Sequence, residues 1–210
     1  MTKTRTKKIK IKPGYHSKPS FQDRKEEICS KAAMLFAQKG YLSTSMNNIA
    51  EEMNLKKAGL YHYLKNKEML LFEIMNRTLD TFLERARNLP LDGLSPEEKL
   101  HQLIREYTTT LVRYCNEVAL MLLDSKYLQP KLRKTIYAKR IKYEKLFWSI
   151  IEEGISKKIF VKHDGKETLS FLIIGAIFNY YLWHPSELGK DVEKKIDSFS
   201  KFFLNGLLIR

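Results

Sequence analysis

Cysteine, glycine and proline are scarce in this chain of 210 residues, which holds 2, 9 and 6 of them respectively. The two cysteines, Cys29 and Cys115, cannot form a disulfide framework or a four-cysteine metal site, and they fit a reducing cytoplasm. The low glycine and proline counts argue against collagen-like chains, low-complexity chains and turn-rich β-sandwiches. The composition therefore favours a helical protein.

Long apolar runs are missing too. The longest uncharged apolar run, residues 169–183, falls short of the roughly 20 residues that a membrane span needs, and it contains Ser170 and Asn179. The first 20 residues are basic and have no apolar core of signal-peptide length. We therefore expect a soluble cytoplasmic protein that does not enter a membrane, with a buried core or interface helix at 169–183.

The residue patterns of common enzymes and metal sites are absent as well. The five histidines form no pair at i, i+4 spacing, and neither a glycine-rich phosphate loop nor a nucleophile elbow occurs. Two pairs of adjacent carboxylates, at 97–98 and 152–153, are expected on helix surfaces or caps. The sequence thus predicts that the protein is not an enzyme and that it uses no catalytic residue, no metal and no cofactor.

Basic residues gather in the first third of the chain. Lys and Arg number 38 against 24 Asp and Glu, giving a formal net charge of +14, and residues 1–67 hold 15 of these bases but only 5 of the acids. Such a distribution is typical of proteins that bind nucleic acid or an anionic membrane, although lysines that only maintain solubility give the same balance. Residues 1–20 predict a flexible basic arm, which either follows DNA or is a disordered solubilising tail.

Apolar residues at helical spacing predict an all-α fold of about nine helices, three short ones followed by longer ones, with no strand. We expect Asp23 to cap the first helix and Gly40 to stop it. A capping box at 95–98 starts a later helix that continues to about residue 114. The other long helices are predicted at about 68–89, 130–157, 167–183 and 191–208, with a short one at 117–123.

Two of the short helices, joined by a tight turn, predict a helix-turn-helix. Asn54 tolerates the positive φ that the turn requires, and Leu55 supplies the apolar residue that is buried behind it. In the helix that follows, Leu60, Tyr63 and Leu64 are expected to face inward. The remaining side chains are small, polar or basic and are therefore expected to face the DNA major groove: Lys56, Lys57, Ala58, Gly59, Tyr61 and His62.

A longer pattern over residues 24–71 supports the same interpretation. Its members are Ile28, Ala32, Ala33, Leu35, Phe36, Gly40, Thr44, Ser45, Met46, Ile49, Ala50, Leu60, Tyr61, His62, Tyr63, Lys67, Glu68, Leu70 and Leu71. At these spacings the stretch closely resembles the N-terminal domain of TetR-family transcriptional regulators. The resemblance implies a homodimer whose variable C-terminal domain binds an inducer and dimerises through its last two long helices.

The resemblance also implies roles for single residues. Five positions that match family residues are expected to touch DNA: Ser45, Lys57, Tyr61, His62 and Lys67. The tyrosine and the histidine would pack on the sugar-phosphate backbone, and Lys67 would hold a phosphate. Without DNA contacts, Tyr61 would be a partly buried aromatic and Lys67 a solvated lysine.

The chain departs from the family pattern at three positions. Asn54 replaces the usual glycine, Lys56 replaces a serine or threonine, and Asn47 replaces an arginine. The recognition helix consequently lacks a hydroxyl N-cap, which is worth about 1 kcal/mol. The base preference of relatives therefore cannot be transferred to this chain.

The organisation that follows is a basic arm at 1–20, a helix-turn-helix domain at 21–66 (about 22–82 by the family's usual span) and a ligand-binding and dimerisation domain at 67–210. Aromatic residues in the last part predict an apolar ligand pocket, although each of them also suits ordinary core or a dimer interface. The candidate ligand-binding residues are Tyr107, Leu111, Tyr114, Tyr137, Ile141, Phe147, Phe171, Ile174 and Phe178.

The C-terminal half weakly resembles the family branch with regulators of the FadR and KstR type, which respond to acyl-CoA thioesters. A basic cluster between Lys131 and Lys142 either holds an anionic headgroup or is a solvated face. We predict a homodimeric repressor that a small hydrophobic effector, such as an acyl-CoA or another apolar metabolite, releases from double-stranded operator DNA. The alternative is a basic helical adaptor or membrane-surface protein without sequence-specific DNA binding.

Overall fold

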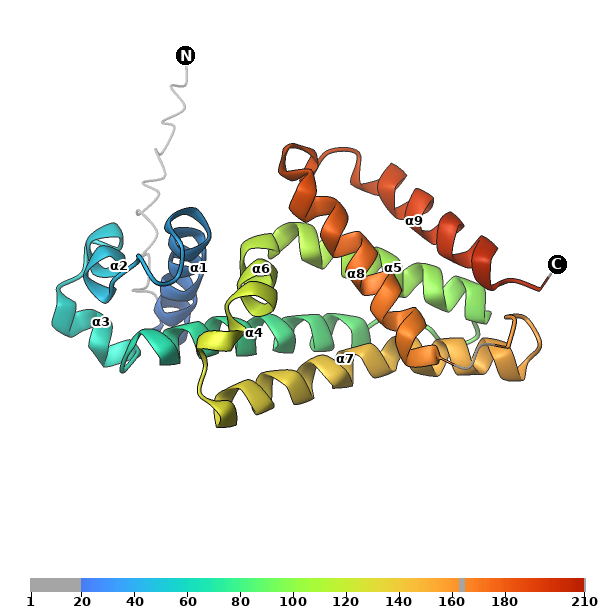
Figure 1. Cartoon of the computed structure of the whole chain (residues 1–210), viewed down its shortest axis with the longest axis horizontal. Coiled ribbons are helices and arrows are strands. Elements are labelled where there is room, and N and C mark those ends of the chain that lie inside the picture. The colour runs from blue at the N-terminus through green and yellow to red at the C-terminus, as the bar shows by residue number, and fades with distance from the viewer. Residues whose placement is uncertain (1–19, 163–164, 210) are drawn as a thin grey trace, which may run out of the picture.

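The computed structural model describes residues 20–162 and 165–209, so most of the basic arm predicted at 1–20 lies outside the described residues. In the described part the chain folds into nine α-helices and two short 3₁₀ helices, with one isolated β-bridge between Phe160 and Leu208. This confirms the predicted all-α fold. The helices, drawn in Figure 1, are α1 (Phe21–Lys39), α2 (Met46–Glu52), α3 (Lys57–Tyr63), α4 (Lys67–Arg87), α5 (Pro96–Arg113), α6 (Cys115–Leu123), η1 (Ser125–Tyr127), α7 (Pro130–Ser156), α8 (Lys166–Trp183), η2 (Pro185–Glu187) and α9 (Val192–Leu207).

Short-range capping contacts fix where the helices begin. The prediction that Asp23 caps α1 is wrong: Ser20 is the N-cap, and its hydroxyl accepts from the Asp23 N–H at 3.1 Å. Asp23 instead takes the third helical position, from which its carboxylate reaches back to the Ser20 N–H at 2.9 Å. The capping box of Ser95 and Glu98 at the start of α5 is confirmed.

Two hydrophobic clusters form the core. The first packs α1, α2 and α3 against the start of α4 and against Leu120, Leu128 and Ile136 of the C-terminal part. The second packs the end of α4 with α5, α7, α8 and α9. Helix α4 belongs to both clusters, and Figure 1 shows it running from the helix-turn-helix end beside α7. Its 21 residues span about 30 Å, so one rigid element connects the two parts.

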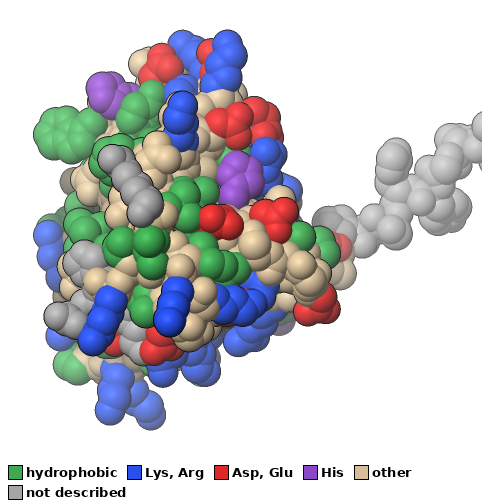
Figure 2. Space-filling model, turned by 90° about the vertical axis from the view of Figure 1, so that its right-hand side faces the viewer, with side chains coloured by type: hydrophobic (Ala, Val, Ile, Leu, Met, Phe, Trp, Pro, Cys, Tyr) green, Lys and Arg blue, Asp and Glu red, His purple; other side chains and the backbone are tan. Residues whose placement is uncertain are grey.

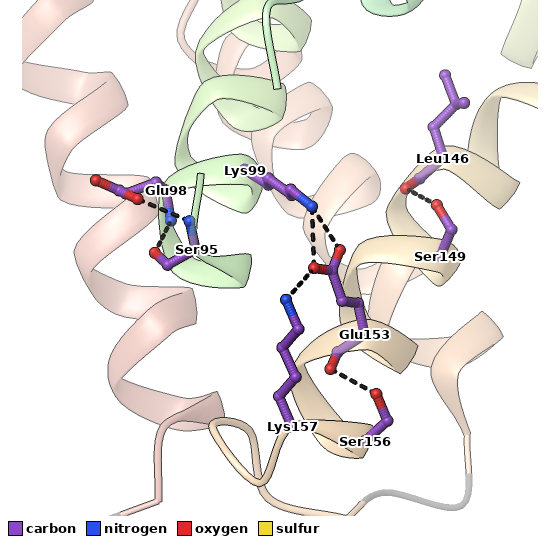
Figure 3. Close-up of polar contacts among 8 residues, drawn as sticks. All are labelled: Ser95, Glu98, Lys99, Leu146, Ser149, Glu153, Ser156 and Lys157. Atoms are coloured by element: carbon purple, nitrogen blue, oxygen red, sulfur yellow. Dashed lines mark hydrogen bonds and ion pairs between the residues drawn. The ribbon is translucent and has the colours of Figure 1, made fainter. Parts of the chain in front are cut away.

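Polar contacts join α5 to α7 at the end of the molecule far from α3 (Figure 3). The Lys99 ammonium lies 2.8 Å from a Glu153 oxygen, and Lys157 binds the same carboxylate at 2.7 Å. Hydrogen bonds from these two lysines lower the pKa of Glu153. Glu98 and Glu153, one from each pair of adjacent carboxylates, thus have structural partners. Among the described residues, no helix is long and apolar enough to cross a membrane.

Candidate DNA interface and effector chamber

The turn between α2 and α3 has the predicted backbone. Asn54 adopts φ 51°, in the left-handed region that asparagine tolerates better than most residues. The Leu55 N–H donates to the Ala50 carbonyl at 2.8 Å, and the Leu55 side chain packs against the first core cluster. The turn therefore fixes the angle at which α3 leaves α2, as a helix-turn-helix requires.

Helix α3 separates its side chains as expected. Leu60 and Leu64 are buried and Tyr63 is half-buried. On the other side, the structure brings together five exposed residues of the predicted DNA-binding set, namely Lys56, Lys57, Ala58, Tyr61 and His62. Tyr61 is 39% exposed, which fits both a tyrosine that can meet DNA and the alternative of a partly buried aromatic.

Gly59 lies in α3, and a Cβ atom built there would meet no heavy atom within 4 Å. Its φ is also outside the positive range that favours glycine. The fold thus gives no reason for a glycine at this position. A helix interior disfavours glycine by roughly 0.5–1 kcal/mol relative to alanine, so this residue lowers the stability of α3.

The N-termini of α2 and α3 differ in their capping. Ser45 caps α2: its hydroxyl accepts from the Asn48 N–H at 3.2 Å and lies 2.7 Å from the Asn48 side-chain oxygen. Ser45 is exposed, so it remains able to meet DNA while its hydroxyl is bonded within the turn. At α3 the N-cap is Lys56, which makes no side-chain cap, as predicted. Lysine also places positive charge where the helix dipole disfavours it.

Lys67, at the first position of α4, has a structural role that the sequence did not reveal. Its ammonium donates to the carbonyl oxygens of Tyr41 at 3.0 Å, Leu42 at 3.3 Å and Thr44 at 3.0 Å, and it lies 4.4 Å from the centre of the Tyr41 ring. These three bonds use all three ammonium protons. Lys67 therefore holds the turn that precedes Ser45 in place. Backbone carbonyls converge here only through tertiary folding, so no sequence signal could have identified this contact.

His62 contacts the first helix as well as facing outward. Its ring lies edge-on to Phe21 at 5.6 Å, and Phe21 stacks on Tyr63 at 4.7 Å. This aromatic group of Phe21, His62 and Tyr63 joins the C-terminal end of α3 to the start of α1. It fixes the orientation of the His62 ring beside the exposed face of α3.

An apolar hollow, which we call the chamber, lies among α4, α5, α6, α7 and α8. Its wall includes Leu79, Phe82, Tyr107, Met121, Tyr143 and Ile174. The Tyr107 hydroxyl donates to the Ile174 carbonyl at 3.1 Å, which fixes one side of the wall. The chamber volume is about 50 Å³, far below the roughly 300–1,000 Å³ of ordinary ligand pockets. A sizeable ligand would therefore have to move at least one of the helices that form the chamber wall.

The structure distributes the nine predicted ligand-binding residues unevenly. Tyr107 and Ile174 line the chamber. Leu111, Phe147 and Phe178 are buried in the surrounding core cluster, and Ile141 is half-buried. These four residues therefore lie outside the chamber lining, and so do the remaining three. Tyr114 borders a separate polar hollow, and Tyr137 and Phe171 are exposed, by 55% and 59%.

Polar residues that the sequence did not predict to bind the ligand also line the chamber. Arg140, from the basic cluster of α7, lies 3.1 Å from the Glu144 carboxylate. Burial raises the pKa of Glu144, while Arg140 opposes that rise. The Tyr143 hydroxyl is buried and has no hydrogen-bond partner in the described part of the chain. Burial also raises the pKa of Tyr143 well above its ordinary value, so this hydroxyl stays protonated and can donate.

Contacts run from the chamber toward the helix-turn-helix. Met121 of α6 lines the chamber and packs against both core clusters. Just after α6, the Tyr127 ring stacks on Tyr41 at 5.1 Å. Tyr41 is also the residue whose carbonyl and ring hold Lys67. A displacement of α6 would therefore reach the turn that begins α2.

Two family models match the chain. Residues 28–74 match the bacterial regulatory proteins of the tetR family, and residues 93–207 match the tetracyclin repressor-like C-terminal domain. The transcriptional repressor KstR2 of Mycolicibacterium smegmatis is 26% identical over 145 residues, which cover 69% of this chain and 70% of that protein.

Solved structures agree with the family models. AibR, crystallised with isovaleryl coenzyme A and operator DNA, superposes with a TM-score of 0.75 at 28% identity, covering 85% of this chain and 97% of AibR. A tetR-family protein from Rhodococcus RHA1 reaches a TM-score of 0.81 at 22% identity, covering 89% and 97% of the two chains, and so shares the fold. With the C-terminal model alone covering more than half of its length, the chain belongs to the TetR family of DNA-binding transcriptional regulators.

Proposed function

We propose that this regulator is a homodimeric repressor that a small acyl-CoA or similar apolar ligand releases from its operator. The observation that carries the proposal is the position of the chamber. Its walls come from α4, which leads to α3, and from α6. The η1 segment that follows α6 contacts the turn before α2 through Tyr127 and Tyr41. The solved complex of AibR with isovaleryl coenzyme A and operator DNA supports this ligand class.

The chamber chemistry suits a ligand with an apolar tail and a polar end. Leu79, Phe82 and Met121 offer an apolar surface to an acyl chain. At the polar side, the unpartnered Tyr143 hydroxyl could donate to a thioester carbonyl, and Arg140 could meet an anionic group. Since the closed chamber is only about 50 Å³, a bound acyl group would push α4 and α6 apart. A ligand drives that movement only if it binds the opened state more tightly.

Movement of α4 would alter DNA binding through geometry. In a dimer the two α3 helices must enter successive major grooves about 34 Å apart. Tilting a rigid helix of about 30 Å changes that separation, because α3 lies at its N-terminal end. At the DNA, Lys56 and Lys57 would approach phosphates or guanine edges, while Tyr61 and His62 would pack on the backbone.

The dimer would form through α8 and α9. These helices expose large apolar residues in the single chain: Phe171 (59%), Trp183 (78%) and Phe202 (74%). A groove of about 460 Å³ between the helices is lined by Leu172, Phe202 and neighbouring apolar residues. Figure 2 shows hydrophobic side chains reaching the surface at the end of the molecule where α9 finishes. Exposed patches of this kind mark interaction surfaces, and homodimers are typical of the family.

The test uses operator DNA selected from a random pool and measures its binding by fluorescence anisotropy. Isovaleryl-CoA and longer acyl-CoAs are compared with free coenzyme A. An inducer must weaken operator binding, and operator must weaken inducer binding by the same factor in calorimetry. Equal affinities for free and DNA-bound dimer would exclude that compound as an inducer.

Tyr143→Phe makes the ligand test specific to the chamber. The Tyr143 hydroxyl has no hydrogen-bond partner among the described residues, so its removal breaks no bond in the free protein. We expect unchanged or higher thermal stability, because an unsatisfied buried hydroxyl is removed, and about tenfold weaker acyl-CoA binding, which corresponds to one lost hydrogen bond of about 1.4 kcal/mol. The control is Tyr107→Phe, which loses the bond to Ile174 and lowers stability instead.

A further inference from the structure

A second hollow lies where the DNA-binding end of the molecule meets the C-terminal part. This junction cleft has a volume of about 260 Å³ and lies between α1, α4 and the corner where α5 passes into α6. Its charged lining consists of Glu26 from α1, Arg77 from α4, and Arg113 and Glu117 from the α5–α6 corner. The chamber has none of these residues in its lining, so the cleft is a separate site.

The cleft holds hydrogen-bond donors that the protein leaves unused. One nitrogen of Arg77, Nη2, lies 2.8 Å from Glu26. Its other nitrogen, Nη1, is shielded from solvent, lies 4.0 Å from a Glu73 oxygen and makes no hydrogen bond with a described residue. Arg113 forms no ion pair in the described part of the chain, and its guanidinium rests 5.6 Å from the Tyr114 ring. A shielded guanidinium nitrogen that lacks a hydrogen bond is costly. An anionic group in the cleft would accept from this nitrogen of Arg77 and would also meet the exposed Arg113.

The same cleft also holds an unused acceptor. Glu117 is half-buried in the first turn of α6, and among the described residues its carboxylate accepts only from its own backbone N–H. Burial raises the pKa of this carboxyl, as expected for an acid without a cationic partner. Beside it, the Thr81 hydroxyl donates to the Arg77 carbonyl at 3.1 Å and keeps lone pairs free to accept. A cationic ligand group would meet these acceptors.

We propose that the junction cleft binds a free amino acid, with its carboxylate on Arg77 and Arg113 and its ammonium group on Glu117. The formal charges of the lining support a zwitterion, because the two arginines balance the acids Glu26 and Glu117. Glu73, which lies behind Arg77, is itself paired with Lys25 at 2.7 Å. A multiply charged anion, such as the phosphates of coenzyme A, would find no net positive charge there. The volume of about 260 Å³ lies below the range of drug-sized pockets and suits a small ligand.

The position of the cleft gives such a ligand a distinct effect. Glu26 belongs to α1 of the DNA-binding part, whereas Arg113 and Glu117 belong to the α5–α6 corner of the C-terminal part. An amino acid bound to Arg77, Arg113 and Glu117 would fasten α4 to the α5–α6 corner, and α1 would be joined to them through the ion pair of Glu26 with Arg77. It would therefore raise thermal stability through binding to the folded state, without entering the chamber.

Isothermal titration calorimetry of the full chain with each standard L-amino acid tests the proposal. We expect at least one to bind, and we expect its decarboxylated amine and its deaminated acid to bind at least tenfold more weakly. Arg113→Gln and Glu117→Gln remove one charge each and should also weaken binding at least tenfold. Tyr143→Phe, in the chamber, should leave amino-acid binding unchanged. Thermal melts without ligand check folding, and Thr81→Val replaces any variant that fails to fold.

Three results would overturn the proposal. The first is that no amino acid binds the wild-type chain. The second is that a bound amino acid keeps its affinity in Arg113→Gln and Glu117→Gln but loses it in Tyr143→Phe, which would place it in the chamber. The third is displacement of the amino acid by free coenzyme A, which would assign the cleft to the headgroup of an acyl-CoA. The acyl-CoA proposal is tested by operator release, so the two proposals can fail independently.

Discussion

Replacing Gly59 with alanine should change stability and DNA binding in opposite directions. In the free protein the added methyl group meets no heavy atom within 4 Å. Alanine is favoured over glycine inside a helix by roughly 0.5–1 kcal/mol. For a chain of this size we expect the melting temperature to rise by about 1–4 °C. We expect this stabilisation to stay small, because α3 is only seven residues long and gains little stability from its own hydrogen bonds.

At the DNA surface the same methyl group should be harmful. Gly59 lies on α3 between Ala58 and the exposed pair of Tyr61 and His62, where a duplex would approach the backbone closely. A methyl group that holds α3 away from the groove weakens several contacts at once, each worth about 1–3 kcal/mol. We expect operator affinity to fall at least tenfold, measured by anisotropy at constant salt.

Gly154→Ala is the matched control for this experiment. A Cβ atom at Gly154 would lie 2.1 Å from a ring carbon of Phe160, so alanine there should destabilise the fold by about 1–3 kcal/mol. Because Gly154 is in α7, far from α3, the folded variant should bind operator normally. Unchanged operator affinity in Gly59→Ala would show that α3 does not approach DNA at this residue. A lower melting temperature would show that the added methyl group does not fit the space around residue 59.

Three further predictions concern the dimer, the coupling and the α2 turn. Phe202→Asp should give folded monomers in light scattering, because this side chain is 74% exposed in the single chain. The control Leu42→Asp, at the DNA end, should leave the dimer intact. A dimeric Phe202→Asp would disprove the α8–α9 contact. Tyr127→Ala should keep effector affinity but reduce the effector's influence on operator binding. Tyr137→Ala, at an exposed residue, should leave that influence unchanged. Equal influence in both variants would show that the contact between Tyr127 and Tyr41 does not couple the effector to operator binding. Lys67→Gln should lower the free energy of unfolding by about 1–3 kcal/mol, since part-buried carbonyls lose their ammonium donor; no change in denaturant melts would mean that a solvated lysine is the correct description.

The structure also changes how the dimer is best tested. Phe178 lies on α8, one of the two helices of the proposed dimer contact. In the folded chain Phe178 is only 4% exposed and belongs to the second core cluster. An aspartate at Phe178 would therefore unfold the protein instead of separating two chains. Exposed residues such as Phe202 avoid this ambiguity.

The sequence by itself determined the elements whose signals are local. The spacing of apolar residues produced the all-α fold, because a helix repeats every 3.6 residues whatever it packs against. Asn54 and Leu55 marked the turn. Once the apolar residues of α3 were assigned to the inward face, the remaining residues had to face outward. Even the wrong cap at Asp23 missed the true one, Ser20, by only three residues, because both members of a capping box are typical cap residues.

Only the tertiary structure decided the contacts between distant segments. Lys67 meets carbonyl oxygens more than twenty residues earlier in the chain, and Tyr127 meets Tyr41 across the two parts. The ligand candidates were selected for aromatic character, which does not distinguish a chamber wall from an exposed face such as that of Phe171. Arg77, Arg113 and Glu117 are unremarkable along the sequence, and folding brings them around one cleft. Such sites depend on how helices pack against one another, and local periodicity carries no record of that packing.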